Sequence, residues 1–102
     1  MPAVENAPPA LRGELVLYMR PGCHVCAEGE SLLTPLLAAV GRTVRHVDVA
    51  LDPAAEARYG ERVPVLTCDG RELCWGRFDP AVLAALFGQS VVRARRSRWP
   101  RR

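Results

Sequence analysis

The chain of 102 residues contains no lysine and no apolar run of the length that crosses a membrane. A membrane-spanning helix needs about 18 or more consecutive apolar residues, so the sequence predicts no span. All 14 positively charged side chains are arginines. No chemistry demands this choice, and we interpret it as a coding bias of the genome.

The first residues also lack the apolar segment of a secretory signal peptide. Residues 1–13 hold three prolines and no such segment, so we expect a disordered lead and a cytoplasmic location. Four cysteines in a short chain are compatible with a disulfide scaffold. Without a secretion signal, a redox or metal role is the favoured interpretation.

Charge is divided unevenly along the chain. Six arginines lie between Arg93 and Arg102 without any acid, which leaves eight arginines against eleven acids, a formal charge of −3, before them. We expect a mildly acidic domain over 14–90 and a basic, disordered tail over 91–102. A solvated tail is favoured over nucleic-acid or acidic-membrane contact. The sequence therefore predicts one monomeric domain without a membrane or nucleic-acid partner.

Hydrophobic periodicity predicts seven elements in the order strand, helix, strand, helix, strand, strand, helix. The expected ranges are 15–19, 23–40, 44–49, 53–59, 63–67, 72–78 and 80–87. The first three elements form a parallel crossover unit, and a turn at Asp69-Gly70 makes the last two strands an antiparallel hairpin. The predicted fold class is α/β, with a four-stranded mixed sheet flanked by helices.

Cys23 and Cys26 form a Cys-x-x-Cys pair at the junction of the first strand and the first helix. Unpaired N–H groups at a helix start favour an anion, so a thiolate at Cys23 is stabilised there. Cys26 lies one turn further and can attack a mixed disulfide on Cys23. Structural pairs and zinc half-sites share this spacing, whereas haem attachment requires a histidine where Ala27 stands. The strand–helix context favours redox chemistry.

The remaining candidate metal ligands are Cys68, Cys74, His24 and His46. With a regular two-residue turn, position 65 pairs with 74, and the two sulfurs point to opposite faces of the hairpin. With a three-residue turn they share a face but lie diagonally. We therefore predict two small buried hydrophobes and no metal site.

Two polar residues of the second strand and one proline have more than one interpretation. His46 is typical of a structural histidine. Asp48 is either a polar strand residue or a proton acceptor near Cys26. The Val63-Pro64 bond is either an ordinary trans bond at a strand start or a cis bond that offers the Val63 backbone to a peptide-like substrate.

Taken together, these motifs resemble the glutaredoxin family, and most closely its small bacterial glutaredoxin-like branch. The resemblance covers about 15–87. It is carried by Leu15-Val16-Leu17-Tyr18, Cys23-His24-Val25-Cys26, Arg62-Val63-Pro64-Val65 and Gly76-Arg77-Phe78-Asp79.

The resemblance implies a thioredoxin fold in which Cys23 attacks and Cys26 resolves. It also implies that Val63-Pro64 is cis and faces the cysteine pair. One departure lies between the cysteines, where His24-Val25 replaces the usual Pro-Tyr.

The resemblance further implies a glutathione site. The matching positions are Arg20, before the cysteine pair, Val63, before the proline, and Gly76 and Asp79, which open the last helix. Arg77 departs from the family pattern because it stands where a second glycine is usual. Its side chain either fills the glutathione cleft or pairs with a glutathione carboxylate.

The predicted function is a thiol–disulfide oxidoreductase that reduces protein or glutathione mixed disulfides. Glutathione is the expected co-substrate, and no cofactor is expected to be tightly bound. Two other functions are kept open. One is a redox-sensing or binding module with little turnover. The other is an iron–sulfur cluster carrier, since some glutaredoxins hold a cluster between two subunits.

Overall fold

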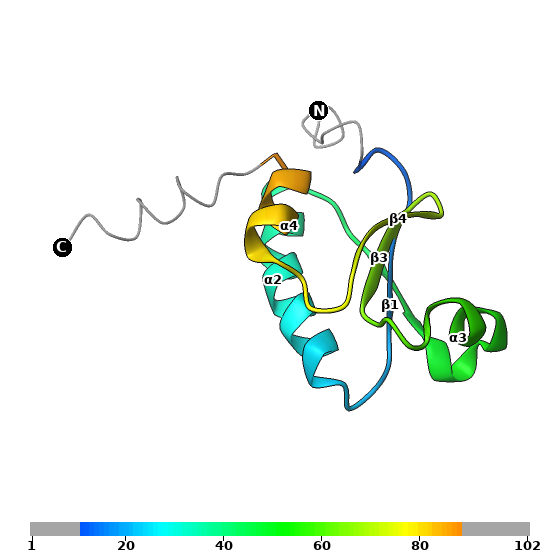
Figure 1. Ribbon diagram of the computed structural model, residues 1–102. Helices are drawn as coiled ribbons and strands as arrows, with labels where there is room; N and C mark the ends of the chain where they lie inside the picture. The colour runs from blue at the N-terminus through cyan, green and yellow to red at the C-terminus, as the bar shows by residue number, and fades with distance from the viewer. Residues whose placement is uncertain (1–10, 89–102) are drawn as a thin grey trace.

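The computed structural model describes residues 11–88, which form one four-stranded sheet with three α-helices (Figure 1). Residues 1–10 and 89–102 lie outside the described residues, so the predicted disorder of 1–10 and of the tail stays a prediction. For the end of the lead the prediction is wrong, because Leu11 is fully buried in the core. Among residues 11–88, no helix combines the length and the apolar character needed to cross a membrane. The elements are β1 (Leu15–Met19), α2 (His24–Val40), β2 (Arg45–Asp48), α3 (Pro53–Tyr59), β3 (Val65–Cys68), β4 (Arg71–Trp75) and α4 (Pro80–Leu86).

The strands are ordered β2-β1-β3-β4. β1 runs parallel to β2 and antiparallel to β3, and β3 pairs with β4 in an antiparallel hairpin. Strand, crossover helix and parallel strand come first in the chain, and the hairpin follows them. This is the predicted mixed sheet, in the thioredoxin-like arrangement that the resemblance implies.

Local signals set the helix ends. Gly41 ends α2 in the left-handed conformation, with φ 67°, which a glycine adopts without strain. Asp52 and Asp79 each cap a short helix by accepting a backbone N–H, and proline follows each of them at the first helical position. These starts agree with the predicted ones.

The sheet is covered on both faces. Figure 1 shows α2 and α4 on one side of the sheet and α3 on the other. Alternation along β1 sends Leu15 and Leu17 into the larger core and Tyr18 toward α3. The larger core contains Leu11, Leu15, Leu17, Leu33, Leu37, Val40, Leu66, Cys68, Phe78, Leu83 and Phe87.

Three strands are shorter or shifted relative to their predicted ranges. β2 ends at Asp48 because its side chain caps a 3-10 turn over Val49–Leu51. β3 begins at Val65, after Pro64, whose nitrogen has no hydrogen for a ladder bond. β4 ends at Trp75, since a turn at Gly76 leads the chain toward α4.

The predicted register of the hairpin is wrong at one end. Cys68 pairs with Arg71, as a two-residue turn requires, but Val65 pairs with Trp75 rather than with position 74. A β-bulge places one extra residue in β4, so Leu66 and Cys74 become partners. Cys68 and Cys74 therefore face the same core and remain free thiols.

Candidate functional site

The cysteine pair lies where the strand–helix pattern predicts it. Cys23 is the N-cap of α2, with φ −94° and ψ 111°, and its Sγ accepts the backbone N–H of Cys26 at 3.1 Å. The two residues form a disulfide with their Cα atoms 5.2 Å apart. Cys23 is partly exposed, whereas Cys26 is only 4% exposed. An attacking thiol must be reachable, and a resolving thiol need not be.

The surroundings of Cys23 favour its thiolate. The first turn of α2 has no acidic residue, and its backbone N–H groups point toward the cap. An open hollow of about 350 Å³ lies beside the sulfur, lined by Gly22, Cys23, His24 and Ala27. A disulfide can therefore approach Cys23 from solvent.

The peptide bond between Val63 and Pro64 is cis, as the resemblance implies. Pro64 is buried and lies against α2, because a Cβ on Gly29 would be 3.3 Å from its Cγ. Gly29 follows Cys26 by three residues and is on the same helix face. Pro64 therefore packs on the face of α2 that carries Cys26, whereas the side chain of Val63 packs with the core on the α3 side of the sheet.

Gly76 joins the proline turn to the segment that opens α4. Its N–H donates to the carbonyl oxygens of Arg62 at 3.0 Å and of Pro64 at 2.9 Å. Its φ of 72° suits glycine. Three residues further, Oδ1 of Asp79 accepts the N–H of Ala81 at 2.9 Å. The backbone of Gly76 therefore ties the Val63-Pro64 turn to the segment that leads into α4.

Arg20 is directed toward α3. Its Nη2 donates to the carbonyl oxygen of Gly60 at 2.6 Å, and its Nη1 lies 3.2 Å from Oε1 of Glu56. Arg77, in contrast, crosses from the loop before α4 to α2 and pairs with Glu28. No local sequence pattern points to Glu28, because its partner is 49 positions away.

The remaining candidate residues from the sequence, Asp48, His46, Cys68 and Cys74, lie in settings that do not suit catalysis. Asp48 accepts the N–H of Ala50 at 2.9 Å, so its carboxylate acts as a cap. Nε2 of His46 lies 2.7 Å from Oε2 of Glu30, on the surface. Burial raises the pKa of the Cys74 thiol to about 11 and also raises the pKa of Cys68. Neither thiol is poised as a nucleophile at neutral pH.

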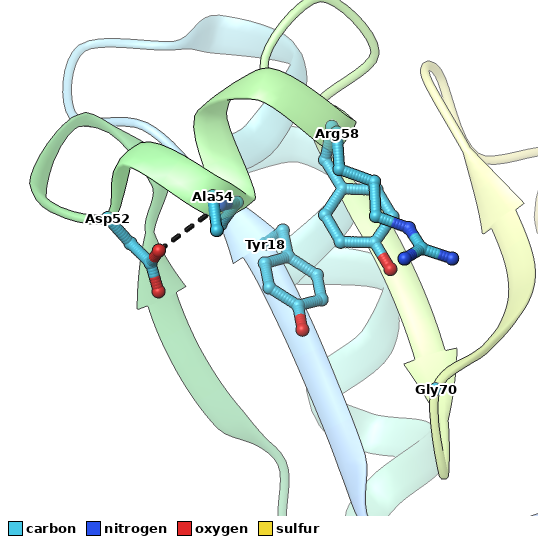
Figure 2. A pocket seen from close by; sticks show the side chains of 7 residues that line it. Tyr18, Asp52, Ala54, Arg58 and Gly70 are labelled. Atoms are coloured by element: carbon cyan, nitrogen blue, oxygen red, sulfur yellow. Dashed lines mark hydrogen bonds between the residues drawn. The ribbon is translucent and has the colours of Figure 1, made fainter.

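A second hollow, of about 460 Å³, lies on the α3 side of the sheet (Figure 2). Its described lining consists of Tyr18, Asp52, Ala54, Ala55, Arg58, Tyr59 and Gly70. The rings of Tyr18 and Tyr59 are 4.2 Å apart between centroids. None of these lining residues is a cysteine, and the cysteine pair belongs to α2, on the opposite face of the sheet. We therefore centre the candidate site on Cys23.

The sequence matches known proteins over most of its length. The profile described as "Glutaredoxin-like domain (DUF836)" matches residues 14–88. An uncharacterised protein of Mycobacterium tuberculosis is 30% identical over 85 residues, which is 78% of this chain and 88% of the relative.

Two solved structures are similar as well. The structural-genomics target XcR50 from X. campestris has a TM-score of 0.60 and 38% identity, covering 70% of this chain and 91% of that chain. Protein Ne2328 from Nitrosomonas europaea has a TM-score of 0.62 and 30% identity, covering 72% of this chain and 89% of that chain. The chain therefore belongs to the family of glutaredoxin-like domains, with a Cys-x-x-Cys pair at a helix start that suits a thiol–disulfide redox role.

Proposed function

We propose that this protein is a thiol–disulfide oxidoreductase that reduces protein or glutathione mixed disulfides, with glutathione as its reductant. The observation that carries the proposal is the asymmetry of the cysteine pair. Cys23 is partly exposed at the start of α2 beside an open hollow, and Cys26 is buried one turn further. One sulfur is placed to meet a substrate and the other to release it.

The first step forms a bond between the Cys23 sulfur and one sulfur of the substrate disulfide. The substrate's sulfur–sulfur bond breaks, and the leaving sulfur takes the electron pair and then a proton. The N–H groups at the start of α2 stabilise the Cys23 thiolate before attack.

The second step closes the Cys23–Cys26 disulfide. Cys26 gives up its proton and attacks Sγ of Cys23, and the bound substrate sulfur leaves as a thiolate. Two electrons have then passed from the protein dithiol to the substrate, and the protein is in the disulfide form seen here. Two glutathione molecules restore the dithiol and leave as glutathione disulfide.

The proposed glutathione contacts follow the family resemblance. The Val63 backbone would pair with the cysteinyl backbone of glutathione as an added strand does. The Asp79 oxygen that does not cap α4 would meet the ammonium group. Pro64 and Gly76 would shape the cleft, and Arg20 would reach the glycine carboxylate after leaving both Glu56 and the carbonyl oxygen of Gly60.

The test is reduction of a glutathione mixed disulfide and of a protein disulfide by the reduced protein. Cys23→Ser should abolish both reactions. Cys26→Ser should keep the first, because a second glutathione can replace the resolving thiol, and should lose most of the second. No turnover by the wild type, together with stoichiometric oxidation of its dithiol, would support a redox-sensing or binding module instead.

A further inference from the structure

The ion pair between Arg77 and Glu28 links the loop before α4 to α2. Arg77 follows Gly76, whose N–H is held by Pro64, so the loop that carries the arginine is fixed beside the cis proline. The side chains of Arg77 and Glu28 are 67% and 52% exposed. The pair therefore lies at the surface, where a dissolved anion can reach the guanidinium.

The helix geometry places this pair near Cys23. Glu28 lies four residues after His24, so the two share one exposed face of α2. His24 and Ala27 line the hollow beside the Cys23 sulfur. A substrate attached to Cys23 and extending along α2 therefore approaches the guanidinium of Arg77.

The interactions that hold the side chains of Arg77 and Arg20 differ in strength. Arg20 is held by the carbonyl oxygen of Gly60 as well as by Glu56. Arg77 is held by an exposed carboxylate, and exposed ion pairs of this kind are weak and easily screened. A second carboxylate can therefore replace Glu28 at Arg77 at little cost, whereas Arg20 would lose a backbone acceptor too.

We propose that Arg77 binds the carboxylate of a small anionic thiol or its disulfide, in the place that Glu28 occupies in the free protein. This inference rests on the proposed function, because it concerns the substrate of the same cysteine pair. Glu28 acts as an internal competitor, and Arg77 determines the preference for anionic over neutral thiols.

The experiment measures how fast small thiols open the Cys23–Cys26 disulfide in the full chain. The incoming thiolate bonds to Sγ of Cys23, the Cys23–Cys26 bond breaks, and Cys26 takes the electron pair and a proton. The probes are 3-mercaptopropionate and 3-mercaptopropionamide, which have the same length and differ in charge. Each rate constant is referred to the thiolate concentration, and the readout is the ratio of the anionic to the neutral rate.

The two partners of the ion pair should change this ratio in opposite directions. Arg77→Gln should lower it about threefold or more, because the guanidinium is gone. Glu28→Gln should raise it, because the competitor is gone. Arg45→Gln is the matched control and should leave the ratio unchanged. Arg45 is an exposed arginine of β2 that pairs with Glu14.

A purely structural ion pair predicts the same response to both substitutions. Shifts of the same sign, or no shift in either variant, would overturn the proposal. The reaction is stoichiometric and needs no turnover. A wild type that fails the catalytic assay but keeps the opposite shifts would therefore refute the proposed function and leave this inference standing.

Discussion

Gly29 of α2 faces the ring of Phe78 so closely that a Cβ at position 29 would lie 3.0 Å from Cδ2 of that ring. Phe78 is 4% exposed and lies in the segment between Gly76 and Asp79. The same Cβ would be 3.3 Å from Cγ of Pro64. The missing side chain thus lets α2, the cis proline and the loop before α4 pack together around the cysteine pair.

Substitution of Gly29 should reveal this close packing. Alanine improves helix propensity by about 1 kcal/mol, but the buried ring must move, so Gly29→Ala should raise the melting temperature little or not at all. Gly29→Val should lower it by several degrees, since overpacking costs about 1–3 kcal/mol. Ala39→Val, at an exposed position of α2, controls for the β-branched side chain. Equal melting temperatures for the two valine variants would contradict the packing argument.

The two cysteines of the pair should differ in reactivity once they are reduced. Alkylation at pH 7 should modify Cys23 first, because it is partly exposed and its thiolate is stabilised at the start of α2. Cys26 is buried and should be modified slowly. Mass spectrometry of the variants Cys23→Ser and Cys26→Ser after timed labelling checks this. Faster labelling of Cys26 would reverse the proposed roles.

Cys74 should resist alkylation at neutral pH. Burial raises the pKa of its thiol from 9.0 to about 11, so the folded protein holds the proton more tightly than the unfolded chain does. Its contribution to stability is therefore fully present below about pH 9 and is lost as the pH rises through 11. Urea titrations should show that the free energy of unfolding declines from pH 8 to pH 11, and that this decline is smaller in Cys74→Ala than in the wild type. An equal decline in both proteins would be the contrary result.

Much of this fold follows from short-range patterns in the sequence. The apolar run of β1, the periodicity of α2 and the Asp-Pro starts of α3 and α4 each reflect local preferences, and the structure confirms them. Local pattern likewise predicts the Cys23–Cys26 pair at the helix start. A cysteine pair directly after a buried strand needs no distant residue to define its setting.

Long-range geometry accounts for what the sequence did not predict. The β-bulge opposite Leu66 depends on how β4 fits β3 and the core, so it changed the partner of Cys74 without a local signal. The contact of Arg77 with Glu28 and that of Arg20 with Gly60 join segments distant in sequence. Which arginine pairs with α2 could therefore be decided only in three dimensions.

The role of Asp79 as a helix cap can be separated from its proposed role in binding glutathione, because Asp52 provides a matched control. Both aspartates cap helices of seven residues that begin with proline. Asp79→Ala and Asp52→Ala should each cost about 1 kcal/mol of stability, whereas the asparagine variants keep an oxygen for the backbone N–H and should melt close to the wild type. Only Asp79→Asn should raise KM for a glutathione mixed disulfide, since it removes the charge proposed to meet the ammonium group. Unchanged kinetics in Asp79→Asn would restrict Asp79 to its role as a cap and point to a thiol donor that is not recognised through its ammonium group.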